Sequence, residues 1–151
     1  PGNLRFAYVG HSMGGAVGVL AGSRNERLEV LVNLAGMIRT ADFCEREFGE
    51  VTPGEGTMWD EPDCPLSQGY VDDLKGIGDL FEEVSVLRKP LLLIHGTTDD
   101  VVLPEDSKDA FKLAAEPKQI VLIEGAGHVF DQTSYPKVVD AAAKWLAQHL
   151  A

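Results

Sequence analysis

The feature that most constrains this chain is a serine between a predicted strand and a predicted glycine-rich helix. Residues 4–9, LRFAYV, are mostly apolar and end at Gly10, as expected of a buried strand. From Gly14 to about residue 23 the chain reads GGAVGVLAGS, and such small residues suit a helix packed closely against a sheet. The turn between them is Gly-His-Ser-Met-Gly, residues 10–14. A sharp strand-to-helix turn of this kind exposes its serine at the carboxyl end of the strand.

Ser12 therefore has the position that a nucleophilic serine needs. A serine hydroxyl is a weak nucleophile, so it requires exposure, a base and a site for the developing oxyanion. The same turn directs the backbone N–H of Met13 toward that oxyanion. The turn brings the strand and the helix close together. We therefore expect positions 10 and 14, and position 15 behind them, to require small residues, and all three are glycine. The bare Gly-x-Ser-x-Gly pattern is common by chance, but its place between a strand and a helix makes it far more specific.

Further apolar segments extend the alternation of strands and helices along the chain. Strands are predicted at 29–35, 91–94 and 119–123, and helices at 104–115 and 135–149. Near-continuous apolar strands that alternate with helices are typical of a parallel sheet covered on both faces. The predicted fold class is α/β, a single domain over residues 1–151 with about four parallel strands flanked by helices.

Residues 37–78 interrupt this alternation. The segment is polar, contains several prolines and glycines, and includes Phe43, Phe48, Trp59 and Tyr70. Loops longer than about 15 residues inside a compact domain are usually functional or disordered. Because the aromatic residues argue against disorder, we interpret the segment as a cap or lid inserted over the edge of the sheet. The alternative is a mobile surface loop.

Four histidines are candidates for the base that activates Ser12. His149 lies near the end of the last predicted helix, and His95 ends a predicted strand, where a buried structural role is expected. His11 adjoins the serine but points elsewhere on a tight turn, so we expect it to form part of a pocket wall. His128 follows the last predicted strand in Gly-Ala-Gly-His. Functional groups of open α/β sheets gather at this carboxyl edge, and His128 is therefore the predicted base.

The acid that orients the histidine is expected from a loop at the same edge. The strand at 91–94 runs into HGTTDDVV, which offers Asp99 and Asp100. Either aspartate could instead be an ordinary turn residue. A serine, an acid and a histidine then follow one another along the chain, each just past a predicted strand, which is the order expected of α/β-hydrolases.

Composition restricts the partners of the protein. The net charge of −11 argues against nucleic acid or an anionic membrane, because phosphate recognition needs clustered Lys and Arg. No apolar run reaches the roughly 18 residues of a membrane span. No secretion signal is visible, so Cys44 and Cys64 are expected to be free thiols and a cytoplasmic location is favoured. The cysteines belong to no metal-ligand pattern, and no metal or organic cofactor is expected.

Three segments together resemble the α/β-hydrolase superfamily, namely GHSMGG at 10–15, PLLLIHGTTDDVV at 90–102 and IEGAGH at 123–128. The resemblance is greatest to the feruloyl and cinnamoyl esterases and to dienelactone-hydrolase-like proteins. The family's His-Gly-x-x-Asp pattern places the acid at Asp99 rather than Asp100. Some of these esterases also carry a cap insertion after the strand that follows the nucleophile, which matches residues 37–78.

The resemblance also implies that this chain is the carboxyl-terminal half of a longer hydrolase. Members of the superfamily place about four strands and a helix before the nucleophile, whereas eleven residues precede Ser12 here. The N-terminal half would supply the second oxyanion donor and the strand that pairs with residues 4–9. We expect that half to be needed to cover an otherwise open apolar edge, and we expect the isolated chain to be weak or inactive.

These expectations describe a serine hydrolase that acts on a small-molecule ester through an acyl-enzyme, with catalytic residues Ser12, Asp99 and His128. The N–H of Met13 is the expected oxyanion donor. Expected substrate contacts are His11, Met37, Trp59 and Val101, although Trp59 alternatively packs into a small local core. The same residues would serve a peptidase, a thioesterase or a lactone hydrolase. A non-catalytic binding module with this fold is a further alternative.

Overall fold

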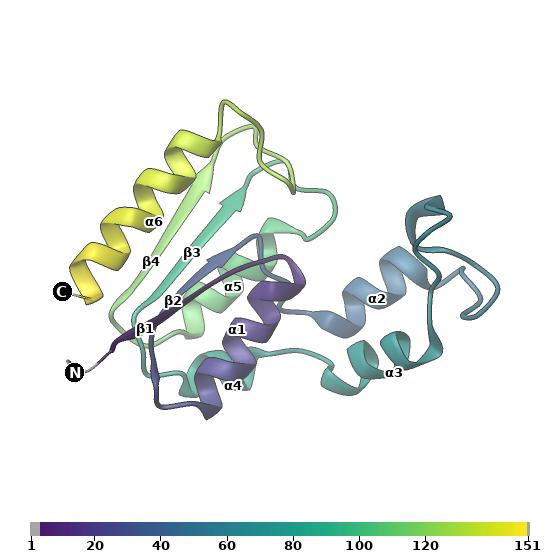
Figure 1. The fold of residues 1–151 in the computed structure, drawn as a ribbon, viewed down its shortest axis with the longest axis horizontal. Coiled ribbons are helices and arrows are strands. Elements are labelled where there is room, and N and C mark those ends of the chain that lie inside the picture. Colours follow the sequence, from purple (N-terminus) through teal and green to yellow (C-terminus); the bar gives the residue numbers. More distant parts are fainter. Residues whose placement is uncertain (1–3, 151) are drawn as a thin grey trace. The chain divides into compact units, whose positions relative to one another are not determined.

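A parallel sheet of four strands carries the predicted functional residues (Figure 1). The computed structural model describes residues 4–150. The strands are β1 (Phe6–His11), β2 (Leu28–Leu34), β3 (Leu91–Gly96) and β4 (Lys118–Ile123). They lie side by side in the order β1-β2-β3-β4, and each neighbouring pair is parallel. All four carboxyl ends therefore meet at one edge of the sheet.

Helices cover both faces of this sheet. On one face α6 (Tyr135–Leu150) contacts all four strands. On the other face α1 (Met13–Arg24) contacts β1 and β2, and α5 (Pro104–Leu113) contacts β3 and β4 (Figure 1). The short helix α4 (Phe81–Val86) contacts both α1 and α5. These layers confirm the predicted α/β class, a parallel sheet flanked by helices.

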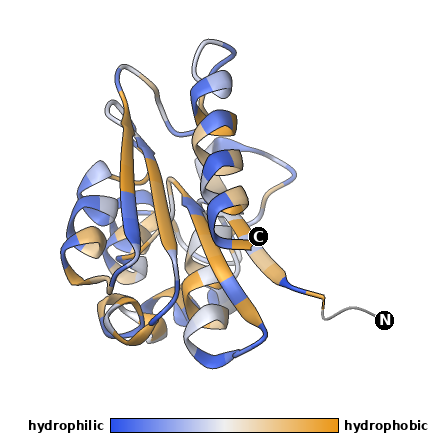
Figure 2. Ribbon diagram, turned by 90° about the vertical axis from the view of Figure 1, so that its left-hand side faces the viewer, coloured by the Kyte–Doolittle hydropathy of each residue, from blue (hydrophilic) through white to orange (hydrophobic). Residues whose placement is uncertain are grey.

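The two central strands are apolar on both faces because helices cover both of their sides. Val32 and Leu92 face α6 and pack in one core cluster with Trp145. Leu31 and Leu93 alternate with them along the strands and are also buried, on the side of α1 and α5. Figure 2 shows the strands as largely hydrophobic ribbons. Each fully buried leucine stabilises the fold by about 1.5–3 kcal/mol, so the sheet is the main source of stability in this part of the chain.

The described chain divides into two compact units. The sheet and its helices belong to the first unit, which the segment Arg39–Leu80 interrupts. That segment is the second unit and contains α2 (Thr40–Phe48), the short 3-10 helix η1 (Met58–Asp60) and α3 (Gln68–Ile77). It nearly coincides with residues 37–78, and its role as a cap stays a prediction.

Aromatic side chains form a small core in the second unit. The ring of Phe48 lies 5.9 Å from Phe43, 5.1 Å from Trp59 and 6.2 Å from Tyr70, all with edge-to-face geometry. The indole N–H of Trp59 donates to the carboxylate of Glu47 at 2.9 Å. Trp59 thus packs locally, as one of its two predicted roles requires, while 53% of it stays exposed.

Some elements differ from the prediction. β1 begins at Phe6 rather than at residue 4, and Leu4 is 81% exposed. Helices α2, α3 and α4 are not among the predicted elements. The six residues of α4 are too few to show a helical period, and α2 and α3 are rich in charged residues and lie among prolines and glycines.

The state of the two cysteines agrees with the prediction from the sequence. Cys44 is buried, Cys64 is exposed, and both are free, as predicted. None of the helices described within residues 4–150 is long and apolar enough to cross a membrane.

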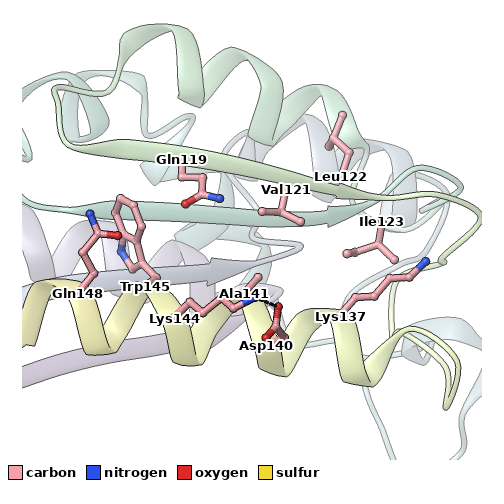
Figure 3. A pocket seen from close by; sticks show the side chains of 10 residues that line it. All are labelled: Gln119, Val121, Leu122, Ile123, Lys137, Asp140, Ala141, Lys144, Trp145 and Gln148. Atoms are coloured by element: carbon pink, nitrogen blue, oxygen red, sulfur yellow. Dashed lines mark hydrogen bonds and ion pairs between the residues drawn. The ribbon is translucent and has the colours of Figure 1, made fainter.

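A groove of about 530 Å³ runs between β4 and α6 (Figure 3). Val121 and Ile123 line it from the strand, and Ala141, Lys144 and Trp145 line it from the helix. No predicted functional residue is part of its lining. The candidate active site is therefore separate from this groove, at the carboxyl edge of the sheet.

Candidate active site

Ser12 lies at the turn between β1 and α1, and its backbone is strained. Its φ of 56° and ψ of −120° fall in a region that residues with a Cβ avoid, at a cost of about 1–3 kcal/mol. The N–H of Ser12 donates to the carbonyl of Leu34 at 2.9 Å. The carbonyl of Ser12 accepts from Gly15 at 2.9 Å and from Met37 at 3.1 Å. These bonds to β2, α1 and the loop after β2 hold the strained turn in place.

The glycines of this turn differ in the space around them. A Cβ on Gly10 would overlap the carbonyl of Gly14, and a Cβ on Gly15 would lie 2.6 Å from the Cα of Gly36. A Cβ on Gly14 would meet only the hydroxyl of Tyr8, at 3.9 Å. Gly10 and Gly15 must therefore be small, as expected. The expectation for Gly14 is wrong, because a Cβ there would make only an ordinary van der Waals contact.

Two loops at the carboxyl edge bind each other and bring an acid and a base together. Asp99 is in the loop after β3, and His128 is in the loop after β4. The N–H and the hydroxyl of Thr98 both donate to the carbonyl of Ala126, each at 3.0 Å. A Cβ on Gly96 would overlap that same carbonyl, so the glycine permits the close approach of the loops.

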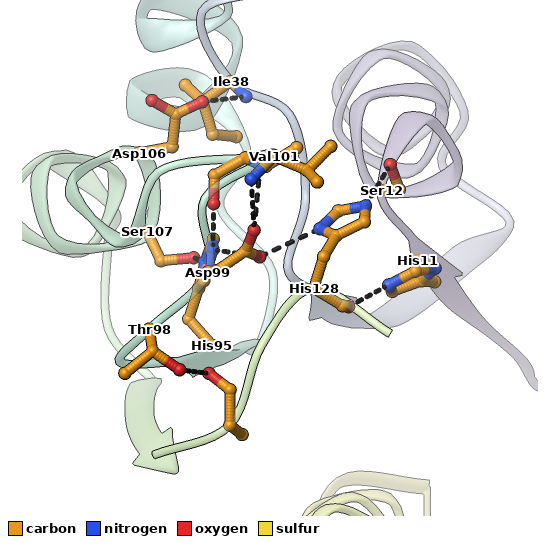
Figure 4. Close-up of polar contacts among 12 residues, drawn as sticks. His11, Ser12, Ile38, His95, Thr98, Asp99, Val101, Asp106, Ser107 and His128 are labelled. Atoms are coloured by element: carbon orange, nitrogen blue, oxygen red, sulfur yellow. Dashed lines mark hydrogen bonds and ion pairs between the residues drawn. The ribbon is translucent and has the colours of Figure 1, made fainter. Parts of the chain in front are cut away.

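His128 contacts Ser12 with one ring nitrogen and Asp99 with the other (Figure 4). Nε2 lies 2.9 Å from Ser12 Oγ, and Nδ1 lies 2.9 Å from Asp99 Oδ2. An ionised carboxylate can only accept, so Nδ1 carries a proton and donates it to Asp99. In the neutral ring Nε2 is then unprotonated and accepts a hydrogen bond from the Ser12 hydroxyl. The structure thus joins the three residues in one chain of hydrogen bonds.

The carboxylate of Asp99 is buried and faces four N–H groups. Oδ1 accepts from the backbone of Val101 at 3.0 Å and of Val102 at 2.9 Å, and Oδ2 lies near His128 and 3.1 Å from His95 Nε2. Burial by itself would raise the pKa of Asp99. The hydrogen bonds from His128 and His95, the charge of protonated His128 and the N–H of Val102 outweigh burial and hold that pKa well below its usual range. Asp99 is therefore ionised at neutral pH.

His11 lies beside His128, and its predicted place in a pocket wall stays a prediction. The two rings are 4.8 Å apart, and His11 Nε2 lies 2.8 Å from the carbonyl oxygen of His128. Because a carbonyl oxygen only accepts, Nε2 of His11 carries the proton in this contact. His11 therefore ties the turn of the serine to the loop of the histidine.

The other predicted site residues differ in how far they are exposed and in where they lie. Met13 is the first residue of α1, a position whose N–H has no carbonyl one turn earlier within the helix. Val101 is partly exposed beside Asp99. Met37 is only 1% exposed, so its side chain offers almost no surface to a ligand. Trp59 belongs to the second unit, Arg39–Leu80.

His95 touches the acid, a contact that its predicted structural role does not include. It is fully buried, as expected, but its Nε2 faces Asp99 and its Nδ1 lies 2.7 Å from Ser107 Oγ. The spacing of His95 and Asp99 could have indicated this, because a loop that turns back after Gly96 brings residues four apart together. Within residues 4–150, no group of three or more His, Cys, Asp or Glu side chains is placed to hold a metal ion.

The fold and this hydrogen-bonded set define the class of α/β-hydrolase proteins. A strained serine between a strand and a helix, followed along the chain by an aspartate and a histidine past later strands, is the arrangement of that fold. The sequence model of the prolyl oligopeptidase family matches residues 3–151, and the chain belongs to this family. The resemblance to the α/β-hydrolase superfamily is thereby confirmed.

Individual proteins are similar over most of this chain. The uncharacterized protein YfhR of Salmonella typhimurium (strain LT2) is 28% identical over 132 residues, which cover 83% of the chain and 40% of YfhR. Est1E from Butyrivibrio proteoclasticus, also solved with ferulic acid bound, has a TM-score of 0.82 at 23% identity, with 97% of this chain and 62% of Est1E covered. Dienelactone hydrolase from Anabaena variabilis has a TM-score of 0.64 at 20% identity, with 97% and 50% covered. The chain therefore spans less than two thirds of each of these proteins.

Alanine substitutions at Gly10 and Gly14 test the packing of the turn. Gly10→Ala places a methyl group against the Gly14 carbonyl, and we expect it to lower the free energy of unfolding by about 1–3 kcal/mol. Gly14→Ala adds a methyl group in open space on a helix, and we expect it to raise that free energy by up to about 1 kcal/mol. Urea denaturation of the full-length protein measures both changes. Equal effects of the two substitutions would contradict the packing described.

Asp99→Asn tests the buried carboxylate, with Asp100→Asn as the matched control because Asp100 is exposed. At neutral pH we expect Asp99→Asn to cost about 1–3 kcal/mol, since an amide N–H then faces other N–H donors. Asp100→Asn should stay within about 0.5 kcal/mol of the wild type.

The stability difference caused by Asp99→Asn should depend on pH. The folded-state pKa of Asp99 is lowered, so its stabilisation is complete above the unfolded carboxyl pKa of about 4 and is lost as pH falls below that value. Denaturation curves from about pH 5 to about pH 3 should show a gap that narrows as pH falls below about 4. A gap that widens in acid would contradict the hydrogen bonding assigned to Asp99.

Proposed function

We propose that the protein hydrolyses carboxylic esters, with Ser12 as the nucleophile, His128 as the general base and Asp99 as the acid that orients the histidine. The observation that carries this proposal is the 2.9 Å separation of Ser12 Oγ and His128 Nε2, with Asp99 at 2.9 Å from the other ring nitrogen. This geometry suits removal of the serine proton while the oxygen attacks a carbonyl carbon. The strained backbone of Ser12 adds support, since such strain clusters at functional sites.

In the proposed first half-reaction, Ser12 Oγ forms a bond to the ester carbonyl carbon as His128 Nε2 takes its proton. The carbonyl oxygen becomes an oxyanion and accepts a hydrogen bond from the N–H of Met13. Ionised Asp99 stabilises the imidazolium through Nδ1–H. The bond to the leaving alcohol then breaks, His128 returns its proton to that alcohol, and the acyl group stays on Ser12.

In the second half-reaction, water replaces the alcohol. His128 takes a proton from the water as its oxygen attacks the acyl carbon, and the bond to Ser12 breaks. The proton returns through His128 to the serine oxygen, which restores the free hydroxyl and releases the carboxylic acid. No cofactor is required for either half.

An ester is the proposed substrate because two structural neighbours point to this chemistry. Est1E has been solved with ferulic acid, an aromatic carboxylic acid, and dienelactone hydrolase is named for a cyclic ester. We propose that His11 and Val101, which lie beside His128 and Asp99, border the bound ester. A contact from Met37 is also proposed, and it requires a movement that exposes the side chain.

The family match favours a peptidase as the second candidate function. The chain belongs to the prolyl oligopeptidase family, whose name gives a peptide bond as the target. Both activities would use the same three residues and differ in the leaving group, an alcohol or an amine. Thioester and lactone hydrolysis, and ligand binding without catalysis, would also leave the geometry unchanged.

A further strand is proposed to cover β1, which is an edge strand of the described sheet. Phe6 and Val9 of β1 are 37% and 48% exposed, and open apolar edges favour pairing with another strand. We propose that the N-terminal part implied by the superfamily supplies this strand and the second oxyanion donor. Activity is therefore to be measured on the full-length protein, and the isolated 151-residue chain should be far less active.

Ser12→Ala tests the proposed nucleophile. A fluorophosphonate probe should label the wild-type full-length protein at Ser12, and the variant should lose both the label and at least about 10³-fold in the rate of ester hydrolysis. Ser23→Ala is the matched control because Ser23 lies at the far end of α1, where its hydroxyl donates to the Leu20 carbonyl at 3.0 Å. Rates on an aryl ester, a feruloyl ester, an aryl thioester and a prolyl anilide measure the leaving-group preference.

Each outcome of this experiment separates the candidates. Faster hydrolysis of the esters supports the proposal, whereas preference for the anilide favours the peptidase. A wild-type protein that is neither labelled nor active on any of these substrates would overturn the catalytic proposal in favour of a binding module.

A further inference from the structure

His95 makes polar contacts through both of its ring nitrogens, although the proposed mechanism does not use this residue (Figure 4). It lies on β3 with its side chain fully buried, on the face covered by α5. Its Nδ1 lies 2.7 Å from Ser107 Oγ of α5. Its Nε2 lies 2.8 Å from the carbonyl oxygen of Val102 and 3.1 Å from Asp99 Oδ2.

These contacts determine which nitrogen of His95 carries the proton. Nε2 faces a carbonyl oxygen and a carboxylate oxygen, which are both acceptors, so it must be protonated to avoid a cost at a buried site. Nδ1 faces a hydroxyl, which can either donate or accept. In the neutral ring Nδ1 therefore accepts from the Ser107 hydroxyl. Ser107, itself fully buried, thus supports the tautomer that donates toward Asp99.

The N–H groups of His95 and His128 face the same carboxylate oxygen. Both Nε2 of His95 and Nδ1 of His128 face Oδ2 of Asp99, while the backbone N–H groups of Val101 and Val102 occupy Oδ1. The two Oδ1 bonds hold one end of the carboxylate, and the N–H groups of His128 and His95 hold the other. The Nε2–H of His95 is shared between the Val102 carbonyl at 2.8 Å and Oδ2 at 3.1 Å. The N–H of His95 also offsets part of the negative charge of Asp99 that would otherwise act on His128 alone. The ring of His11 is the other titratable group against His128.

We infer that His95 is a positioning residue that aims the Asp99 carboxylate at His128 and moderates the charge that His128 experiences, with Ser107 selecting its tautomer. The inference rests on the proposed function, because its kinetic consequence exists only if His128 is the general base. It predicts that loss of the His95 donor strengthens the attraction between Asp99 and the imidazolium of His128. The imidazolium then holds its proton to higher pH, and the base is less available at neutral pH.

His95→Phe and His95→Gln in the full-length protein test this role. Phe fills a similar volume without a donor, whereas the Gln amide can place an N–H near the position of Nε2. We expect His95→Phe to lower kcat by about 10–100-fold and to change KM much less. Losses of this size are typical when a residue that orients a functional side chain, without touching the substrate, is removed. The acidic limb of kcat/KM against pH should move to higher pH in His95→Phe and return toward the wild-type position in His95→Gln.

Leu93→Ala is the control for a purely structural effect. Leu93 is fully buried on the same face of β3, two residues before His95, and makes no hydrogen bond through its side chain. We expect Leu93→Ala to lower the melting temperature without moving the acidic limb. A His95→Phe variant with the wild-type pH profile, or a Leu93→Ala variant with the same displaced limb, would overturn the inference.

Nuclear magnetic resonance of the imidazole groups tests the contact without activity. In the wild-type protein the nitrogen signals of His95 should show a protonated Nε2 and an unprotonated Nδ1, and a protonated Nδ1 with a bare Nε2 would overturn the inference. This measurement needs no variant to fold. Absence of fluorophosphonate labelling at Ser12 would instead defeat the proposed function, so the two failures are distinguishable.

Discussion

The hydrogen bond between Ser12 Oγ and His128 Nε2 is the contact on which the proposed chemistry depends. It joins residues 116 positions apart in the chain, at 2.9 Å. Only the parallel arrangement of the strands makes this possible, because it places the carboxyl ends of β1, β3 and β4 at one edge. The strained turn at Ser12 and the tie between the loops after β3 and β4 then reduce the remaining freedom.

At this edge of the sheet, hydrogen bonds compensate for the burial of the charged carboxylate of Asp99. Asp99 has no exposed side-chain surface, so its charge is costly unless N–H groups replace the lost water. Four N–H groups do so, two from the loop backbone and two from histidines on different strands or loops. The result is an ionised carboxylate in a fixed position, which is what a histidine needs to keep one tautomer.

The strands and the three proposed catalytic residues could be predicted from the sequence. Near-continuous apolar runs such as 91–94 have few alternatives to a buried strand, and the turn at Ser12 is specific in its context. The position of His128 after a strand identified it among four histidines. Helices α2 and α3 were not predicted, although their buried residues recur three or four positions apart. The prolines and glycines around them indicated an irregular segment, and their small aromatic core forms only when Phe48 meets Trp59.

Contacts between side chains were harder to predict than the elements that carry them. The burial of Met37 and the open space at Gly14 depend on how the loop and the helix pack, which spacing alone does not show. His95 is buried as expected, yet its contact with Asp99 depends on the turn of the loop after Gly96. A sequence pattern places a residue near an edge, whereas the hydrogen-bond partner of a buried ring follows from the folded loops.

The proposed covalent step can be tested most directly by trapping it. The full-length protein is mixed with a slowly hydrolysed aryl ester, quenched in acid within the first turnover, digested and analysed by mass spectrometry. The account predicts an acyl group on the peptide that contains Ser12, formed together with one equivalent of released phenol. Turnover of the ester with no adduct at Ser12, or with the acyl group on another residue, would contradict it.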